Sequence, residues 1–488
     1  MSEVEGPYEL PEGWTCTTLG DIISLEYGKG LTKDKRQSEG NVPVYGSSGI
    51  VGYHTDCFTR GPSIIVGRKG SVGSVYLSKV PCWPIDTTYY IEPSAGVDLY
   101  YLFYLISSLN LEFLDKSTAI PGLNRNDAYS LPILLPPLPE QCRIVAKIEE
   151  LFTQLDAGVS ALEKSRAQLK RYRQSVLKAA VEGKLTEEWR RGHPDVEPAS
   201  ILLERIERER EKSGKGRQKK LPQLDTSGLP ELPVGWVWVR WDQVGYSQNG
   251  RAFTSKEYQP NGFKLLRPGN LHASGKVVWT EKNTRYMPER WAEDYPDYII
   301  RSGELVMNLT AQSLQDEFLG RVCVTSPSDI CLLNQRIARL TPIEVVTEYL
   351  LYMFKSRLFR QFVNGLNTGS LIQHMFTTQL AEFVFPLPPL PEQHEIVSEI
   401  ERRLSVADQT EATLEANLKR AVRLRQSILK KAFRGELVPQ NPNDEPASVL
   451  LERIRMERSQ TRPINNRGQA RRGRGRPRKP AAVQLELI

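Results

Sequence analysis

The sequence predicts an α+β protein: two mixed domains joined by two long helices that form an intramolecular antiparallel coiled coil, arranged as a pseudo-two-fold repeat. Three observations predict this fold. The motif Leu135–Gln141 returns unchanged at Leu387–Gln393, and an internal repeat marks duplicated units. After each copy, apolar residues recur with a heptad period, which is typical of a coiled coil. Before each copy lie short β-like runs bounded by glycine, proline or asparagine.

The composition is that of a globular protein. The chain has 488 residues, of which 40% are hydrophobic and 25% charged, so about three folded units are expected at roughly 100–200 residues each. We expect neither a transmembrane span nor a signal peptide. The six cysteines form no Cys-x-x-Cys pair, which favours a reducing, cytoplasmic compartment. The net charge of +7 originates in the segment from Arg462 to Lys479, so overall charge does not by itself indicate a nucleic-acid partner for the body.

Further repeats set the domain boundaries. Three pairs of similar segments support the duplication: Leu10–Trp14 with Leu232–Trp236, Arg173–Lys178 with Arg425–Lys430, and Glu197–Ile206 with Glu445–Ile454. The predicted parts are a first domain at 1–138, a long helix at 139–190, a linker with a short helix at 191–228, a second domain at 229–388, a second long helix at 389–440, and a short helix with a disordered basic tail at 441–488.

Within the domains, β-like runs are predicted at 63–66, 74–77, 88–91, 237–239, 276–279 and 321–324, and helical runs at 97–114 and 345–365.

The long helices carry the coiled-coil seam. In the first copy Ile148, Leu155, Leu162, Leu169 and Val176 form the seam, and the second seam position is partly filled by Ile144, Leu151, Tyr172 and Ala179. In the second copy it is formed by Ile400, Ala407, Leu414, Ala421 and Ile428. About 45 residues at ~1.5 Å each give a rod of roughly 68 Å. The alternative is that each helix packs on its own domain. The equal spacing of the flanking motifs favours mutual pairing, and antiparallel pairing is the simplest geometry within one chain.

Loops of both domains carry polar groups that suit DNA. The candidates in the first domain are Tyr45, Ser47, Ser48, Arg68, Lys69, Ser71, Asn124 and Arg125. Those in the second are Arg267, Asn270, Asn308, Asn334, Gln335, Arg336 and Gln373. Arginine pairs with guanine and asparagine or glutamine with adenine, whereas Lys69 suits a phosphate. The alternative is that Gly67–Gly70 is a solvated hairpin, and that Asn334 and Gln335 satisfy buried backbone groups.

The C-terminal tail contains a further candidate for DNA binding, whereas the chain as a whole lacks several common catalytic motifs. Arg474, Arg476 and Arg478 surround a Gly-Arg-Pro core, the pattern of an AT-hook in the A·T minor groove. The alternative is a nonspecific basic tail that adds salt-sensitive affinity. The chain lacks a P-loop, a dinucleotide or methyl-donor fingerprint and histidines at metal-ligand spacing, so we expect no catalytic residue, metal or bound cofactor.

The sequence resembles the specificity subunits of type I restriction–modification systems over about residues 1–456. The resemblance rests on the duplicated motifs above and on segments within the domains: Val42–Gly49, Gly67–Gly70, Asp86–Tyr90, Gly303–Val306 and Asn334–Gln335.

This resemblance implies a non-catalytic DNA reader of host defence. Each target-recognition domain would read one half of a split double-stranded target, and the paired helices would fix the gap and dock two methyltransferase subunits. Those subunits would use S-adenosylmethionine to methylate adenine N6, and two restriction subunits that use ATP and Mg²⁺ would join them, with no membrane partner. The alternatives from other classes are a stand-alone DNA-binding nuclease with scattered carboxylates and a nonspecific coiled-coil DNA scaffold.

Overall fold

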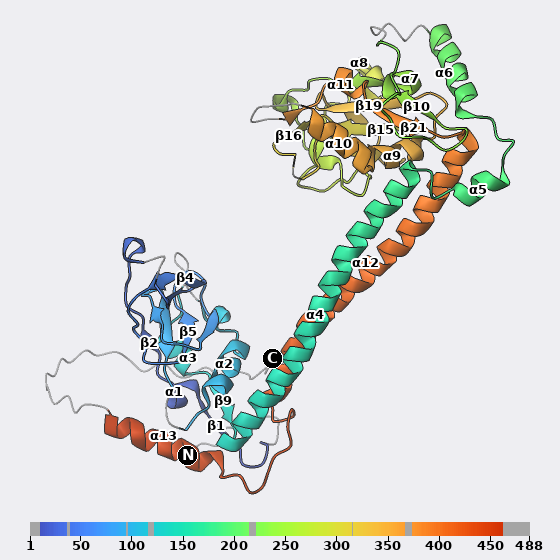
Figure 1. Ribbon diagram of the computed structural model, residues 1–488. Coiled ribbons are helices and arrows are strands. Elements are labelled where there is room, and N and C mark those ends of the chain that lie inside the picture. The colour runs from blue at the N-terminus through green and yellow to red at the C-terminus, as the bar shows by residue number, and fades with distance from the viewer. Residues whose placement is uncertain are drawn as a thin grey trace. The chain divides into compact units, whose positions relative to one another are not determined.

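The computed structural model describes residues 10–36, 40–93, 96–115, 122–213, 221–314, 316–366 and 373–461. They form two compact units: unit 1 comprises residues 1–163 and 415–488, and unit 2 comprises residues 164–414. The division passes through the two long helices, α4 (Leu138–Val181) and α12 (Leu390–Ala432). Each unit therefore contains one of the two mixed α+β domains and part of each long helix (Figure 1).

The two long helices run side by side in opposite directions, which confirms the predicted antiparallel pairing (Figure 1). In unit 2, Arg173 of α4 forms ion pairs with Asp408 and Glu411 of α12. In unit 1, Arg425 of α12 forms an ion pair with Asp156 of α4. Residue numbers thus rise along one helix while they fall along its partner.

The predicted seam is buried along α12, where Ile400, Ala407, Leu414, Ala421 and Ile428 are all less than 10% exposed. In α4 the seam residues Leu155, Leu162 and Leu169 are half-buried. The prediction that Tyr172 lies in the seam is wrong, because its side chain is 41% exposed. The neighbouring Arg173 takes up the contact with α12 through its two ion pairs instead.

The ends of the long helices also pack into the cores of the domains. Ile144 and Ile148 of α4 and Ile428 of α12 belong to the core of unit 1. Val176 of α4 and Ile400 of α12 belong to the core of unit 2. Packing on the domains, the alternative to pairing, therefore holds at the ends of the helices.

Unit 1 is built on an antiparallel sheet with the strand order β2–β8–β5–β6, beside a smaller sheet β4–β3–β7 and the pair β1–β9. Its strands are β1 (Thr15–Thr18), β2 (Glu26–Tyr27), β3 (Val42–Gly46), β4 (Gly49–His54), β5 (Ser63–Gly67), β6 (Val75–Ser78), β7 (Trp83–Pro84), β8 (Thr88–Ile91) and β9 (Pro132–Leu135). Its further helices are α1 (Leu19–Ile22), α2 (Leu99–Ser108), α3 (Arg125–Tyr129) and α13 (Ala447–Thr461).

Unit 2 has a matching antiparallel sheet, β11–β19–β15–β17, and a second four-stranded sheet, β13–β12–β18–β14, with the pairs β10–β21 and β16–β20. Its strands are β10 (Val237–Arg240), β11 (Gly245–Asn249), β12 (Phe263–Leu266), β13 (Tyr286–Met287), β14 (Ile299–Ile300), β15 (Leu305–Asn308), β16 (Thr310–Ala311), β17 (Val322–Val324), β18 (Cys331–Leu333), β19 (Ile337–Pro342), β20 (Gln373–His374) and β21 (Val384–Leu387). Its further helices are α5 (Glu187–Gly192), α6 (Ala199–Ser213), α7 (Trp241–Val244), α8 (Arg290–Asp294), α9 (Thr347–Lys355), α10 (Arg357–Gly365) and α11 (Thr377–Leu380).

One predicted strand, at 276–279, does not form. Its residues make only isolated bridges, Leu271 with Val277 and Lys276 with Val324. The backbone N–H of Val278 instead donates to the carbonyl of Asn270, so this β-prone stretch closes a turn rather than extending a sheet.

The repeated Pro-Glu-Gln triplet ties each long helix to its domain. The buried side chain of Gln141 accepts a hydrogen bond from the backbone N–H of Asp98, just before α2 (2.9 Å), and donates to the carbonyl of the proline five residues upstream (3.0 Å). Gln393 makes the same two bonds in unit 2, with the N–H of Val346 before α9 (2.9 Å) and with the upstream proline (2.9 Å). An unpaired buried amide is costly, so the repeated glutamine fixes the same junction twice.

The glutamate of this triplet is fully paired in unit 2. Glu392 is 1% exposed and accepts hydrogen bonds from Thr186 Oγ1 (2.7 Å), Trp236 Nε1 (2.8 Å), and Arg190 Nε (3.0 Å) and Nη2 (2.7 Å). Arg190 lies on α5. A buried carboxylate thus has a cation and two neutral donors, which is the arrangement that burial of charge requires.

Its counterpart in unit 1 is under-paired. Glu140 is also 1% exposed, but its hydrogen bond comes from the neutral amide of Gln440, at 3.3 Å. Its Oε2 and the Nε1 of Trp14 complete no hydrogen bond among the described residues. Burial raises the pKa of Glu140, and the nearby Trp14, Gln440 and Arg143 offset this only in part. The difference follows from the sequence, which is shorter after Gly435 and has no segment equivalent to α5.

Glu140→Gln is expected to stabilise unit 1 at neutral and higher pH. A carboxyl group whose pKa is raised by folding contributes stability below its unfolded pKa and loses that contribution as the pH rises through its folded pKa. Glutamine is neutral throughout, so the advantage of the variant should be absent below pH 4.5, the ordinary value for the group, and should grow above it. Thermal unfolding of both chains between pH 4 and 8 measures this, and a constant difference across that range would contradict it.

Candidate DNA interface

Two segments that are distant in the sequence meet at one edge of unit 1. The loop after β5 carries Arg68 and Lys69, Asn124 caps the N-terminus of α3, and Arg125 is the first residue of α3. The N–H of Leu123 donates to the carbonyl of Arg68 (2.9 Å), and a β-bridge joins Lys69 to the neighbouring glycine at 122. Four of the predicted DNA-contacting residues are thereby brought together, three of them cationic.

An exposed tyrosine lies between two of these cations. The ring of Tyr27 on β2 is 52% exposed, and its centroid is 5.3 Å from the Cζ of Arg68 and 5.4 Å from the Cζ of Arg125. The guanidinium of Arg68 also donates to the carbonyl of Asp86 (3.2 and 2.5 Å), and that of Arg125 to the carbonyl of Leu25 (3.4 Å). Backbone acceptors and cation–π contacts therefore hold both cations in place before any ligand binds.

Sequence reasoning missed Tyr27. Its position follows from the pairing of β2 with β8, which sets Tyr27 opposite Tyr89 with ring centroids 5.1 Å apart. Burial raises the pKa of Tyr89 to about 12, and its neutral hydroxyl donates to the carbonyl of Leu123 (3.2 Å). No local pattern links Tyr27 with arginines so far along the chain, so only the sheet register could reveal the group.

The serine candidates lie beside this edge. Ser48 and Ser71 are exposed, and Ser47 is half-buried next to the loop that follows β5. The Ser74 hydroxyl donates to the carbonyls of both Ser47 (2.5 Å) and Ser71 (2.8 Å), which joins the two loops. Gly70, with a φ of 82°, makes the turn between them possible.

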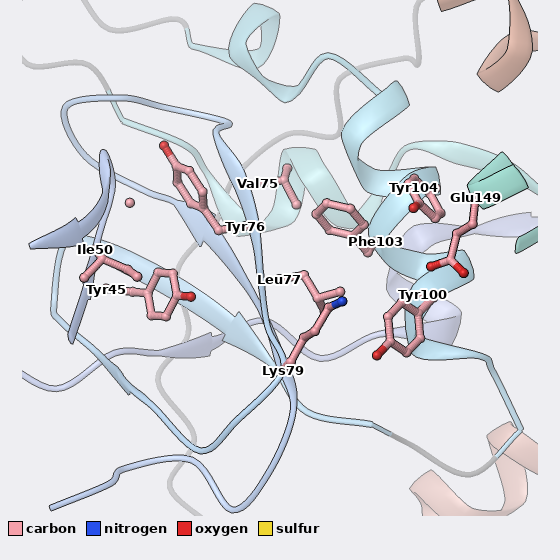
Figure 2. A pocket seen from close by; sticks show the side chains of 11 residues that line it. Tyr45, Ile50, Val75, Tyr76, Leu77, Lys79, Tyr100, Phe103, Tyr104 and Glu149 are labelled. Atoms are coloured by element: carbon pink, nitrogen blue, oxygen red, sulfur yellow. The ribbon is translucent and has the colours of Figure 1, made fainter. Parts of the chain in front are cut away.

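Tyr45 faces a different feature. Its side chain is 8% exposed, burial raises its pKa, and it lines an open pocket of about 570 Å³ between the β4 and β6 strands and α2 (Figure 2). Aromatic rings dominate the lining, with Lys79 and Glu149 as its charged groups (Figure 2). Arg68, Lys69, Asn124 and Arg125 are not among the residues that line this pocket.

In unit 2 the corresponding edge carries Gln335 and Arg336, which are both exposed. The carbonyl of Arg336 accepts a hydrogen bond from the N–H of Leu309 (2.9 Å). Gln373 lies on β20, which pairs with β16 so that Gln373 is opposite Ala311. Three predicted residues therefore meet here, on segments that the sheet brings together.

The asparagine candidates of unit 2 have structural roles. Asn270 and Asn308 are fully buried. Asn270 accepts from the N–H of Arg267 (2.9 Å), and Asn308 donates to the carbonyls of Thr310 (2.7 Å) and Phe318 (2.8 Å). Contact of these two side chains with bases is therefore not supported, because their polar atoms hold turns together below the surface.

Asn334 and Arg267 are neither fully buried nor fully exposed. Asn334 is 8% exposed and accepts from the N–H of Arg336 (3.1 Å), which matches the alternative of a backbone-satisfying role. Gln335 is exposed, so that alternative does not extend to it. Arg267 is half-buried, with its Cζ 5.7 Å from the ring centroid of Tyr258.

The remaining candidates, Arg474, Arg476 and Arg478, lie outside the described residues. Within the described part of the chain, no group of three or more His, Cys, Asp or Glu side chains is placed to hold a metal ion. None of the helices in that part has the length and apolar character needed to cross a bilayer.

Comparisons with known proteins identify the family. The family described as "Type I restriction modification DNA specificity domain" matches residues 11–169 and 233–420. The EcoDI specificity subunit of Escherichia coli is 28% identical over 92% of this chain and 96% of its own length. The EcoKI specificity subunit of Escherichia coli strain K12 is 31% identical over 68% of this chain and 65% of its own. A solved chain from a study of type I restriction–modification complex assembly shares the fold, with a TM-score of 0.57 at 19% identity, covering 88% of this chain and all of that one. Because the family match covers both domains and much of both long helices, this chain belongs to the type I restriction–modification DNA specificity family.

Proposed function

We propose that this chain is the DNA sequence-specificity subunit of a type I restriction–modification complex, and that each unit reads one half of a bipartite target. The observation that carries this proposal is the edge of unit 1 where Arg68 and Arg125 flank the exposed ring of Tyr27. Guanidinium groups bind guanine edges and phosphates, and an exposed ring offers a stacking surface. Unit 2 presents a different set at its corresponding edge, with Gln335 and Arg336 exposed, which supports two unlike half-targets.

The long helices suit a spacing and docking role. Their antiparallel ion pairs fix one register between α4 and α12, so we propose that this pair sets the gap between the half-targets and docks two methyltransferase subunits. Those subunits would methylate adenine N6 with S-adenosylmethionine, and two restriction subunits that use ATP and Mg²⁺ would complete a cytoplasmic complex. Catalysis would then reside in the partners rather than in this chain.

The nuclease and scaffold alternatives have less support. The named relatives are specificity subunits. Nonspecific DNA binding would not require the two edges to carry different side chains. The tail from Arg462 onward would add affinity that depends on salt rather than on sequence.

The test is to map methylated adenines across the genome in cells with and without this chain. We expect one bipartite motif, two short defined halves separated by a fixed gap, to lose methylation when the chain is absent. An unchanged methylation pattern, in cells where the partner methyltransferase is shown to be present and active with another specificity subunit, would contradict the proposal.

A further inference from the structure

The two candidate edges share one backbone arrangement although their sequences differ. The sheets β2–β8–β5–β6 and β11–β19–β15–β17 have the same order. In unit 1 the N–H of Arg68 donates to the carbonyl of Thr87 (2.9 Å), and that of Leu123 to the carbonyl of Arg68 (2.9 Å). In unit 2 the N–H of Leu309 donates to Arg336 (2.9 Å), and that of Met375 to Leu309 (3.0 Å).

The neighbouring strand repeats the correspondence. The N–H of Gly28 donates to the carbonyl of Thr88 (3.1 Å), and that of Gly250 to the carbonyl of Ile337 (3.0 Å). A Cβ at either glycine would lie 2.1 Å from a backbone oxygen of the facing segment, so both positions require glycine for this close approach. We call the shared arrangement the crossing, because four chain segments meet there in each unit: residues 27–28, 68, 87 and 123–125 in unit 1, and residues 249–250, 309, 336 and 375–377 in unit 2.

These bonds assign equivalent positions residue by residue. Tyr27 and Asn249 are equivalent because they are paired with Tyr89 and Ala338 at the same point of the sheets. The hydrogen bonds above make Arg68 equivalent to Leu309 and Thr87 equivalent to Arg336. The residues that follow Leu123 and Met375 complete the set, Asn124 with Phe376 and Arg125 with Thr377.

The side chains at these positions differ in chemistry. In unit 1 the Arg125 guanidinium makes a cation–π contact with Tyr27, whereas in unit 2 the Asn249 amide donates to the Thr377 hydroxyl (3.3 Å). Arg68 is a partly exposed cation and its equivalent, Leu309, is 2% exposed. Unit 2 instead carries its cation at Arg336, where unit 1 has Thr87. The cation is therefore moved from one segment of the crossing to another.

The position before the short helix also differs. Asn124 is exposed and caps α3 by accepting from the N–H of Asn126 (2.8 Å). Its equivalent, Phe376, is 58% exposed, and its ring centroid lies 4.5 Å from that of His374 on β20. An exposed ring at this position could contact an apolar group of the DNA, such as the methyl group of thymine.

We propose that the crossing determines which bases each unit recognises in its half-target. Its backbone positions the side chains in the same way in both units, and those side chains select the bases. Unit 1 would select through Arg68, Arg125 and Asn124, and unit 2 through Arg336 and Phe376. This inference rests on the proposed function and adds to it the residues that determine specificity. Because the backbone arrangement is the same in both units, a cation at the position of Arg68 and a cation at the position of Arg336 would prefer guanine at different places in their half-targets.

The test exchanges residues between equivalent positions. Arg336→Thr and Thr87→Arg are made in the full-length chain, purified with the subunits that co-purify from its own cells, and used to select duplexes from a randomised library. Phe376→Leu is the third variant. Lys282→Thr is the matched control, since Lys282 is an exposed cation of unit 2 outside the crossing. All four replacements are at exposed or half-buried side chains, and thermal unfolding checks that each variant is folded.

We expect Arg336→Thr to reduce the preference for at least one base of one half-target by about 10-fold or more, the range of one bidentate contact, and to leave the other half unchanged. Thr87→Arg should alter only that other half. Phe376→Leu should weaken discrimination in the same half as Arg336→Thr, and Lys282→Thr should change no base preference.

Two results would overturn the proposal and are distinguishable from each other. If the crossing variants lose affinity evenly for all sequences while the unchanged chain still selects a bipartite target, the crossing contacts phosphates alone; this inference then fails and the proposed function stands. If the unchanged chain selects no bipartite target at all, the proposed function fails and this inference fails with it.

Discussion

Glu392→Gln is expected to lower the free energy of unfolding of unit 2 by about 3 kcal/mol, because removing one member of a buried ion pair leaves the other charge without compensation. The arginine left behind is Arg190, whose side chain is 19% exposed and donates two hydrogen bonds to Glu392. Glutamine has one acceptor oxygen for four donor contacts. The site joins α5 to α12 and, through the hydrogen bond from Arg190 Nη2 to the carbonyl of Gly183 (2.7 Å), to the turn that follows α4. The loss should therefore open the junction of the domain with the long helices.

Hydrogen exchange of the whole chain measures this effect unit by unit. Peptides covering Trp236 and α5 should exchange faster in the variant, while peptides of unit 1 should not change. Glu140→Gln is the matched control, since the same substitution at the equivalent position removes no ion-paired partner. Equal destabilisation by the two substitutions would show that the ion pair is not what holds unit 2 at this junction.

Lengthening both long helices by one heptad is expected to widen the gap between the half-targets by about three base pairs. Seven residues add about 10 Å at ~1.5 Å each, and a base pair spans ~3.4 Å. The pairs Asp156–Arg425 and Arg173–Asp408 set the antiparallel register. Insertions after Glu163 and after Asn417 therefore face each other and preserve the pairs on both sides.

Mapping the methylated motif of cells that carry the lengthened chain measures the gap. The two half-sequences should stay as they were, because neither domain is altered. The control lengthens α4 alone, which shifts the pairs out of register and should reduce methylation at every site. A lengthened chain that still methylates the original motif would show that the helices do not determine the spacing.

The internal repeats made the long helices predictable, but they did not identify the contacts of individual side chains. The duplicated motifs and the heptad period correctly indicated α4 and α12, because both signals are carried by the residues of the helices themselves. Their antiparallel direction followed from the simplest geometry within one chain. Tyr172 was misplaced because the heptad pattern says nothing about Arg173, whose ion pairs with α12 take up the contact there. The different hydrogen-bond partners of Glu140 and Glu392 could not be predicted from the sequence either. The two glutamates stand in identical motifs, and only the segments downstream of the long helices differ.

The loops show where sequence reasoning reaches its limit. Arg68, Lys69, Asn124 and Arg125 were named from residue type alone, and the sheet brings them together. Type alone could not separate Arg336, which is exposed, from Asn308, whose amide is buried on backbone carbonyls. Tyr27 and Phe376 were missed because an aromatic residue is more often part of a core. Only the folded structure shows that these two side chains are exposed.

The most direct test of the account replaces residues 10–134 with the corresponding domain of a relative that has a different target, and maps the methylated motif. We predict that one half of the motif becomes that of the donor, while the other half and the gap stay the same. A change in both halves, or in neither, would show that the two units do not read the target separately and would contradict the account.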